Sequence, residues 1–175
     1  MAMIPIRPAT LSDIPAITRI YAEAVTHGTA SFEIEPPDEA EMTRRFEHLT
    51  GNNFPYIAAE TGGTLAGYAY AGPYRTRPAY RWSVEDSVYI APEMHRRGIG
   101  RALLDALIVE SETRGFRQMI AVIGDSTQQT PSIALHAAAR FKLVGILENV
   151  GFKNGRWLDS VLMQRALGAA GTTKP

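Results

Sequence analysis

Cysteine is absent from the chain of 175 residues. Its absence excludes disulfide bonds, thiolate metal sites and covalent catalysis through a cysteine nucleophile. A chain without cysteine also fits a reducing compartment. We therefore expect a cytoplasmic protein.

Net charge and long apolar runs are missing as well. The 18 Lys and Arg residues balance 18 Asp and Glu residues, so no overall field attracts nucleic acid or an anionic membrane. No apolar run approaches the roughly 20 residues of a transmembrane helix, and residues 1–10 lack a signal-peptide pattern. We expect no nucleic-acid or membrane partner. We also expect no metal, because His27 and His48 lack metal-ligand spacing.

What the chain does contain predicts one compact domain. Hydrophobic residues make up 45% of the sequence, which is enough for a single core. We expect one domain over residues 1–167. A disordered tail is expected over residues 168–175, which are small and polar and lack a periodic apolar face.

Hydrophobic periodicity and turn residues predict an α/β fold. Helices are expected to start at Ser12 as N-cap and at Asp38 as N-cap, and to span residues 99–113 and 132–141. Strands are expected at residues 4–7, 56–60, 65–71, 82–90, 119–123, 143–150 and 158–165. A hairpin turn at Gly62–Gly63 argues against a purely parallel sheet. The prediction is a mixed, partly antiparallel central sheet with helices on both faces.

The strongest local signal is a strand, a basic loop and a helix at residues 88–104, VYIAPEMHRRGIGRALL. The first turn of a helix has unpaired N–H groups that attract an anion. Gly98 and Gly100 lack Cβ, so a phosphate can approach the backbone closely. Three arginines add charge-assisted contacts: Arg96, Arg97 and Arg101. Together these features suit a pyrophosphate.

Two common nucleotide motifs do not fit this loop. The dinucleotide fingerprint needs Gly or Ala where Leu103 stands, and the nucleoside-triphosphate loop needs Gly-Lys-Ser/Thr. The loop instead resembles the Gln/Arg-x-x-Gly-x-Gly/Ala motif of the GCN5-related N-acetyltransferase (GNAT) superfamily, with His95 at the usual Gln or Arg. The resemblance implies a GNAT-type fold and acetyl-CoA as co-substrate. It implies cofactor contacts from Val88, Tyr89, Ile90, His95, Arg96, Arg97, Gly98, Ile99, Gly100 and Arg101.

Four further stretches are similar to the phosphinothricin/methionine-sulfoximine N-acetyltransferase group of this superfamily: residues 29–33, 72–80, 85–89 and 151–159. The resemblance covers about residues 3–165 and implies a small α-amino-acid-like acceptor and a homodimer. The chain departs from the group at Ala139 and Arg140, which replace Leu-Gly, and its loop at residues 125–131 looks longer. We expect the helix that follows this loop to sit slightly differently.

Acetyl transfer to an amine needs a group that removes a proton. Without cysteine, direct attack in a ternary complex is expected. Glu85 is the candidate base, directly or through water, because a carboxylate on a buried strand can have a raised pKa and because it matches the group's glutamate. A structural carboxylate paired with Arg81 is the alternative. The adjacent Asp86 points to the opposite face of a regular strand, although a bulge would weaken that argument.

The resemblance suggests further site residues. His136 matches the group's histidine and is the second catalytic candidate, with a structural role as the alternative. A backbone N–H of Tyr89 or Ile90 could polarise the thioester carbonyl. The expected acceptor-binding residues are two arginines for a carboxylate and two aromatic walls: Arg75, Arg77, Phe32 and Tyr80. Trp82 and Trp157 are interpreted as core or dimer packing.

Three other functions remain open from sequence. The enzyme could use another amine, such as an aminoglycoside, a polyamine or a protein N-terminus. It could be a non-catalytic acyl-CoA sensor, although Glu85 and His136 argue against this. A nucleic-acid-binding module built on residues 95–97 is disfavoured by the zero net charge and the lack of interleaved aromatic residues.

Overall fold

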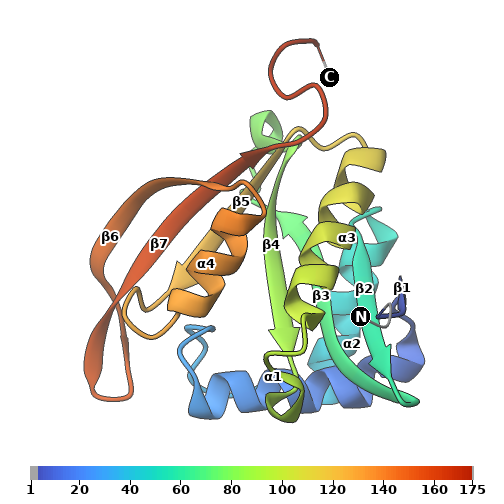
Figure 1. Ribbon diagram of the computed structural model, residues 1–175, viewed down its shortest axis with the longest axis vertical. Coiled ribbons are helices and arrows are strands. Elements are labelled where there is room, and N and C mark those ends of the chain that lie inside the picture. Colours follow the sequence, from blue (N-terminus) through green and yellow to red (C-terminus); the bar gives the residue numbers. More distant parts are fainter. Residues whose placement is uncertain (1–3, 175) are drawn as a thin grey trace.

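A computed structural model describes residues 4–174 as a seven-stranded sheet in the order β1-β2-β3-β4-β5-β7-β6 (Figure 1). Neighbouring strands are antiparallel except β4 and β5, which are parallel. The strands are β1 (Ile6–Pro8), β2 (Tyr56–Thr61), β3 (Thr64–Pro73), β4 (Ser83–Ile90), β5 (Gln118–Gly124), β6 (Lys142–Lys153) and β7 (Arg156–Ala166). The helices are α1 (Ile14–His27), α2 (Glu39–Gly51), α3 (Ile99–Thr113) and α4 (Thr130–Ala138). Short 3-10 turns lie at Leu11–Asp13, Pro78–Tyr80 and Pro92–Met94.

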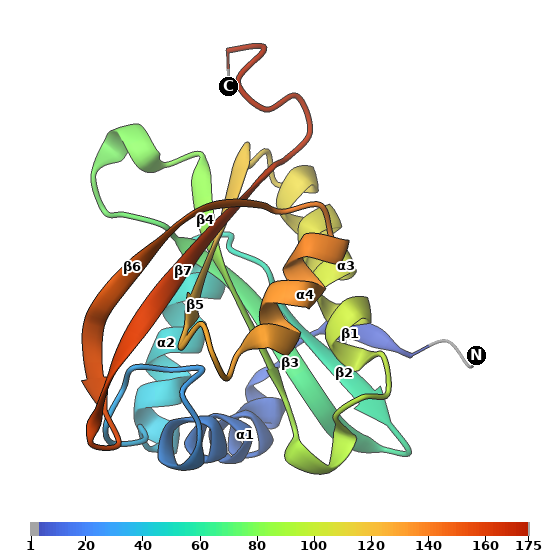
Figure 2. The same ribbon diagram turned by 60° about the vertical axis from the view of Figure 1, so that its left-hand side comes forward.

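Helices cover both faces of the sheet (Figures 1 and 2), and an apolar cluster lies beneath them on each face. On one face α3 buries Leu103, Leu104 and Leu107 completely, and α4 packs beside it. On the other face α1 and α2 cover a row of tyrosines, in which the Tyr68 ring lies 5.3 Å from the Tyr89 ring. The predicted mixed sheet with helices on both faces is confirmed.

The order of elements agrees with the prediction, and α3 has the predicted bounds. The start of α1 differs, because a 3-10 turn with Thr10 as its N-cap precedes the helix and Ser12 lies inside that turn. Asp13 stabilises this turn, because its carboxylate accepts a hydrogen bond from the Thr10 N–H at 2.8 Å and pairs with Arg7 at 2.7 Å. The helix extends to His27 and includes Val25, whose side chain continues the buried stripe and is only 1% exposed.

α4 begins at Thr130, two residues before the predicted start. Pro131 then occupies the first turn, where its missing N–H removes no helical hydrogen bond. The prediction for α2 is confirmed, since the Asp38 carboxylate accepts the N–H of Glu41 at 2.8 Å. β4 pairs with β3 without a register shift, so it contains no bulge on that side.

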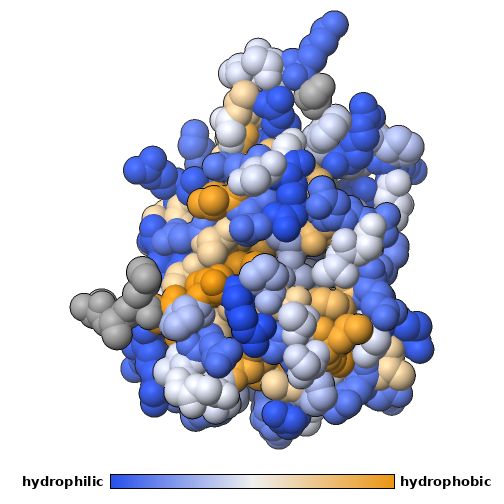
Figure 3. Space-filling view, turned by 90° about the vertical axis from the view of Figure 1, so that its right-hand side faces the viewer, coloured by the Kyte–Doolittle hydropathy of each residue, from blue (hydrophilic) through white to orange (hydrophobic). Residues whose placement is uncertain are grey.

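β6 and β7 form a long hairpin that curves along one edge of the sheet (Figure 2). The hairpin exposes many large apolar side chains: Leu143, Val144, Ile146, Leu147, Val150, Phe152 and Trp157. Trp157 is 61% exposed and therefore does not belong to the core. The opposite side of the molecule is mostly hydrophilic with smaller apolar areas between polar ones (Figure 3).

The last described residues form turns after the end of β7. The N–H of Gly168 donates to a Glu112 carboxylate oxygen at 3.3 Å, and Leu167 is completely buried. The domain limits at 1–167 and the disorder of 168–175 stay predictions, and residues 1–3 and 175 lie outside the described part. No helix between residues 4 and 174 is long and apolar enough to cross a membrane.

Candidate active site

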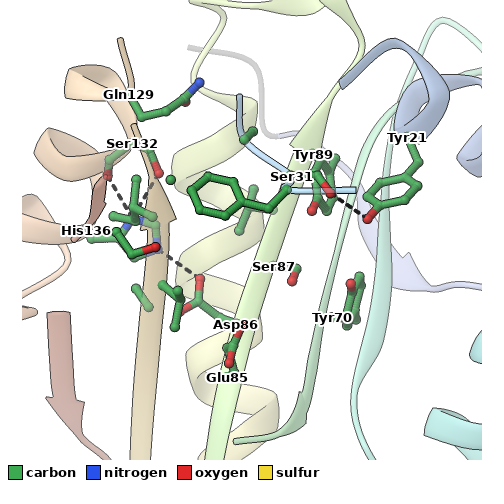
Figure 4. Close-up of a pocket in the computed structure, with 18 residues that line it drawn as sticks. Tyr21, Ser31, Tyr70, Glu85, Asp86, Ser87, Tyr89, Gln129, Ser132 and His136 are labelled. Atoms are coloured by element: carbon green, nitrogen blue, oxygen red, sulfur yellow. Dashed lines mark hydrogen bonds and ion pairs between the residues drawn. The ribbon is translucent and has the colours of Figure 1, made fainter. Parts of the chain in front are cut away.

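The site lies where β4 separates from β5. The two strands pair only from Ser83 to Glu85 on β4, while β4 stays paired with β3 up to Ile90. A cavity of about 320 Å³ occupies this region. Its walls are residues 85–89 of β4, residues 121–124 of β5, the loop residues 30–32, and Ser132 and His136 of α4 (Figure 4).

Glu85 and Asp86 reach this cavity from opposite faces of the sheet. The side chains of β4 alternate, so Val84 and Val88 pack on the α3 side and Tyr89 packs on the α1 side. By this alternation Asp86 faces α4 and Glu85 faces the tyrosine side. Both line the cavity, because β4 has no partner strand on its β5 side beyond Glu85.

Glu85 is suited to exchange a proton near neutral pH. Burial raises the pKa of its carboxyl group to about 7, the neighbouring charge of Asp86 adds to the rise, and the charge of Arg75 opposes it. A carboxylate with such a pKa is deprotonated often enough at pH 7 to act as a base and still holds a proton strongly. This is the property that was expected of it from sequence.

His136 is buried in a hydrogen-bonded pair with Asp86. Its Nε2 lies 2.9 Å from Asp86 Oδ2, and its Nδ1 lies 2.7 Å from the Ser132 carbonyl oxygen (Figure 4). A carbonyl only accepts, so Nδ1 donates, and the remaining shared proton lies between Nε2 and the carboxylate. Burial works to lower the pKa of His136, but the hydrogen bond and charge of Asp86 outweigh it and raise that pKa.

Asp86 lines the cavity and has a second carboxylate oxygen that takes no part in this pair. Its side chain is 2% exposed, and within residues 4–174 its Oδ1 has no hydrogen-bond partner. A buried carboxylate oxygen without a partner is uncommon and marks a place where a donor can bind. From sequence, Asp86 was the less favoured base, and its contact with His136, which lies 50 residues away in the chain, was not predicted.

The glycine loop leads from β4 into α3. Gly98 has φ 80° and Arg96 has φ 60°, so the chain turns sharply twice before the helix. His95 Nε2 lies 3.2 Å from the carbonyl oxygen of Ile90 and connects the loop to the strand. Gly98 is the N-cap of α3 and no side chain in the described region caps it.

This loop fits the pyrophosphate of acetyl-CoA. The first intrahelical hydrogen bond of α3 is donated by Ala102, so the earlier N–H groups of the first turn point outward without a helical partner. A Cβ built on Gly100 lies 3.5 Å from Leu135, so the glycine opens space between α3 and α4. Arg96 and Arg97 are exposed beside it, and Arg101 pairs with Asp105 at 2.6 Å.

The structure gathers only part of the predicted site around the cavity. Five predicted residues line it: Phe32, Glu85, Val88, Tyr89 and His136. Ile99 is buried in the α3 core, while Arg75, Arg77 and Tyr80 lie exposed on the loop before β4 and do not line the cavity. Arg75 stacks on the Tyr74 ring at 5.1 Å. Lining residues that sequence reasoning missed are Tyr21, Ser31, Tyr70, Gln129, Ser132 and Ser160.

Metal ligands are not grouped in this site. The described residues contain no group of three or more His, Asp or Glu side chains that could hold a metal ion.

Comparison with known proteins agrees with this arrangement. Residues 6–162 match the family model for the acetyltransferase (GNAT) domain. The chain is 54% identical to a phosphinothricin N-acetyltransferase of Alcaligenes faecalis, over 93% of this chain and 82% of that protein. It is 36% identical to an L-methionine sulfoximine/L-methionine sulfone acetyltransferase of Pseudomonas paraeruginosa, over 91% and 92% respectively.

A solved structure is similar over nearly the whole chain. It is a GNAT superfamily phosphinothricin acetyltransferase from Sinorhizobium meliloti in complex with AcCoA, with a TM-score of 0.96 and 50% identity, covering 98% of this chain and 92% of that one. The family model and these relatives show that this chain belongs to the GNAT acetyltransferase family.

Proposed function

We propose that this protein transfers the acetyl group of acetyl-CoA to the amine of a small amino-acid-like acceptor, of the phosphinothricin, methionine sulfoximine or methionine sulfone type. The observation that carries the proposal is Glu85, a carboxyl group with a pKa of about 7 that lines the cavity between β4 and β5. The named activities of the relatives support the same acceptor class.

The cofactor side of the site is formed by α3 and the end of β4. In our proposal the pyrophosphate binds to the first-turn N–H groups at Gly98 and Gly100. Charge is supplied by Arg96, Arg97 and Arg101, and His95 holds the loop against Ile90. Beyond Glu85 β4 has no partner on its β5 side, so within Val88, Tyr89 and Ile90 the backbone groups that do not pair with β3 are available to bind the thioester arm. Acetyl-CoA supplies an activated acyl group there.

Glu85 removes the proton of the acceptor amine, directly or through a water molecule. We assign this role to Glu85 rather than to His136, because both ring nitrogens of His136 are engaged by acceptors. His136 then acts as a hydrogen-bonded partner of Asp86 beside the reaction centre. This role keeps His136 in the site but not as the base.

The acceptor is expected to enter on the face of Glu85. Phe32 lines the same cavity as Glu85, and we propose that it forms an aromatic wall for the acceptor. The charge of Arg75 acts on the pKa of Glu85, which supports a place for Arg75 near the acceptor side. We propose that Arg75, together with Arg77 and Tyr80 of the same exposed loop, binds the acceptor carboxylate at the rim of the cavity.

We also propose a cytoplasmic homodimer. The exposed apolar side chains of the β6–β7 hairpin support an interface with a second copy, because large apolar side chains gathered on one exposed element often mark a contact surface. Light scattering on the purified protein should give twice the 19.2 kDa of one chain. Replacing Leu147 by Glu should shift the protein toward the monomer, and an unchanged mass would contradict this interface.

A thiol-release assay tests the proposed reaction. The protein is supplied with acetyl-CoA and with methionine sulfone, phosphinothricin, a polyamine or an aminoglycoside, and free CoA thiol is followed. Turnover of the amino-acid analogues is expected. Turnover of only an unrelated amine would support another acetyltransferase activity, and acetyl-CoA binding without any turnover would support a sensor.

A further inference from the structure

Phe32 lies in the loop between α1 and α2, and its aromatic ring forms part of the cavity wall. The residue is 36% exposed, so it is not part of the core. An aromatic ring on a loop is usually mobile, and a mobile ring cannot define the size of a pocket. The surroundings of this ring therefore decide whether it can act as a wall.

Two glycines leave the space that the ring occupies. A Cβ built on Gly124, at the end of β5, would lie 2.5 Å from Phe32 Cε1 and 2.6 Å from the Thr29 carbonyl oxygen. A Cβ built on Gly151, in β6, would meet the opposite edge of the ring, 2.6 Å from Cδ2. Real Cβ atoms do not approach other atoms this closely. Phe32 thus sits edge-on in a slot between Gly124 and Gly151.

Neither glycine is needed for a turn. Both lie in strands, and neither has a positive φ. Glycine in a strand weakens it and marks a place where another group approaches the backbone closely. Here the group is the Phe32 ring, and the slot joins β5 to the far hairpin strand β6.

The loop on both sides of Phe32 is fastened, so the ring cannot leave the slot without breaking these contacts. The buried Lys153 ammonium group donates to the Ser31 carbonyl oxygen at 2.7 Å. The Tyr21 hydroxyl lies 2.9 Å from the Ser31 hydroxyl and donates to a Glu33 carboxylate oxygen at 2.9 Å. Glu33 also pairs with Arg45 of α2 at 2.7 Å.

We propose that Gly124 and Gly151 are specificity-determining residues: their slot fixes the ring of Phe32 and so sets the space left for the acceptor side chain. This inference rests on the proposed function, because it assumes an amino-acid-like acceptor. The glycines themselves do not touch the acceptor and act through Phe32.

The test compares acceptor selectivity in four variants. The ratio of kcat/KM for methionine sulfone to that for alanine is measured in wild type, Gly151→Ala, Phe32→Ala and the double variant. Gly51→Ala is the matched control, since a Cβ there meets no atom within 4 Å and its φ is ordinary. Gly151→Ala should change the ratio about tenfold or more, because a displaced ring alters the fit of one side chain over another. Gly51→Ala should leave it unchanged.

The double variant shows whether the effect passes through the ring. Once Phe32 is Ala, Gly151→Ala should change the ratio by less than about twofold, because the two substitutions are coupled. If Gly151→Ala alone does not fold, removing the ring should restore folding, and failure of the double variant to fold would overturn the slot. A folded Gly151→Ala protein with the wild-type ratio, or an equal effect without Phe32, would also overturn it.

The same assay separates this inference from the proposed function. Wild-type protein that acetylates neither amino acid would contradict the proposed function. Wild-type turnover with an unaltered ratio in Gly151→Ala would contradict only the slot.

Discussion

Glu85 and Asp86 are neighbours in the chain, yet they line one cavity from opposite faces of the sheet. Asp86 is bound to His136 on the α4 side, and Glu85 stays free to titrate with a pKa of about 7 on the tyrosine side. Two adjacent carboxyl groups thereby have different environments. Carboxyl groups with such different surroundings are suited to different roles, here a base for Glu85 and a hydrogen-bond partner for Asp86.

Stability should depend on pH through Glu85. Its folded pKa of about 7 lies above the ordinary value of 4.5 for this side chain, so the folded state favours the protonated form. This contribution is complete below the unfolded pKa and is lost as pH rises through about 7. Glu85→Gln removes this pH dependence. The free energy of unfolding of the variant, relative to wild type, should therefore be about 1–3 kcal/mol more favourable to the folded state at pH 8 than at pH 5. Urea unfolding at both pH values measures this, and an equal difference at both would contradict the raised pKa.

Removing the Asp86 charge should lower the pKa of His136. Burial already works to lower that pKa, and the hydrogen bond and charge of Asp86 are what hold it up. In Asp86→Asn the imidazole should therefore titrate below its ordinary value, as measured by NMR of the ring protons. Asp105→Asn, on the outer surface of α3, is the control and should leave the His136 titration unchanged. A His136 pKa that does not fall in Asp86→Asn would show that a group other than Asp86 raises it.

The loop before α4 should depend on one ion pair whose carboxylate is buried. Asp125 is 2% exposed, its φ is 59°, and its carboxylate pairs with Arg156 of β7 and accepts the Thr127 hydroxyl at 2.7 Å. Burial works to raise the pKa of Asp125, but these hydrogen bonds lower it below its usual range.

Arg156→Ala should destabilise the protein by about 2–4 kcal/mol, because it leaves a buried carboxylate without its positively charged partner. Arg44→Ala, in an exposed pair with Glu41, should change stability by less than about 1 kcal/mol. Urea unfolding at pH 7 compares the two. Stability from Asp125 is present above its unfolded pKa and is lost as pH falls, so the gap between wild type and Arg156→Ala should narrow in acid. An equal loss of unfolding free energy in Arg156→Ala and Arg44→Ala would contradict a special contribution from the Asp125–Arg156 pair.

Gly100→Val should prevent acetyl-CoA from binding while leaving the fold intact. A Cβ at Gly100 is 3.5 Å from Leu135, an ordinary contact, so the protein has room for it, but the branched side chain would occupy the phosphate approach. We expect at least about a 100-fold loss of affinity by calorimetry. Gly51→Val is the control for adding the same side chain outside the site. Retained affinity for acetyl-CoA in Gly100→Val would contradict pyrophosphate binding at this loop.

The sequence predicted the glycine loop and its strand well because that signal is local. The basic loop, the two glycines and the amphipathic α3 lie within one short stretch, and α3 has the predicted bounds. Glu85 could be proposed as the base because its residue type and strand position are visible in sequence, and that role stays a prediction. Thr10 as the first cap was missed, because the Asp13 contacts with Arg7 and Thr10 outweigh the local preference for Ser12.

The rest of the site could not be predicted because it depends on tertiary contacts. The partner of His136 is 50 residues away, and Lys153 reaches Ser31 across 122 residues. The slot of Phe32 requires two glycines from different strands of the sheet. Only the Ser132–His136 contact, four residues apart on α4, carried a signal that helical spacing could have identified.

The pH dependence of acetyl transfer in wild type and Glu85→Gln tests the account most directly. With acetyl-CoA and methionine sulfone, free thiol is followed from pH 5 to 9, and the variant is first shown to bind acetyl-CoA. The wild-type kcat/KM should rise with pH through about 7, the pKa of Glu85, because the deprotonated carboxylate is the base. Glu85→Gln should lose that step and fall by about 100-fold or more at pH 7. A variant with the wild-type profile and rate would contradict Glu85 as the base.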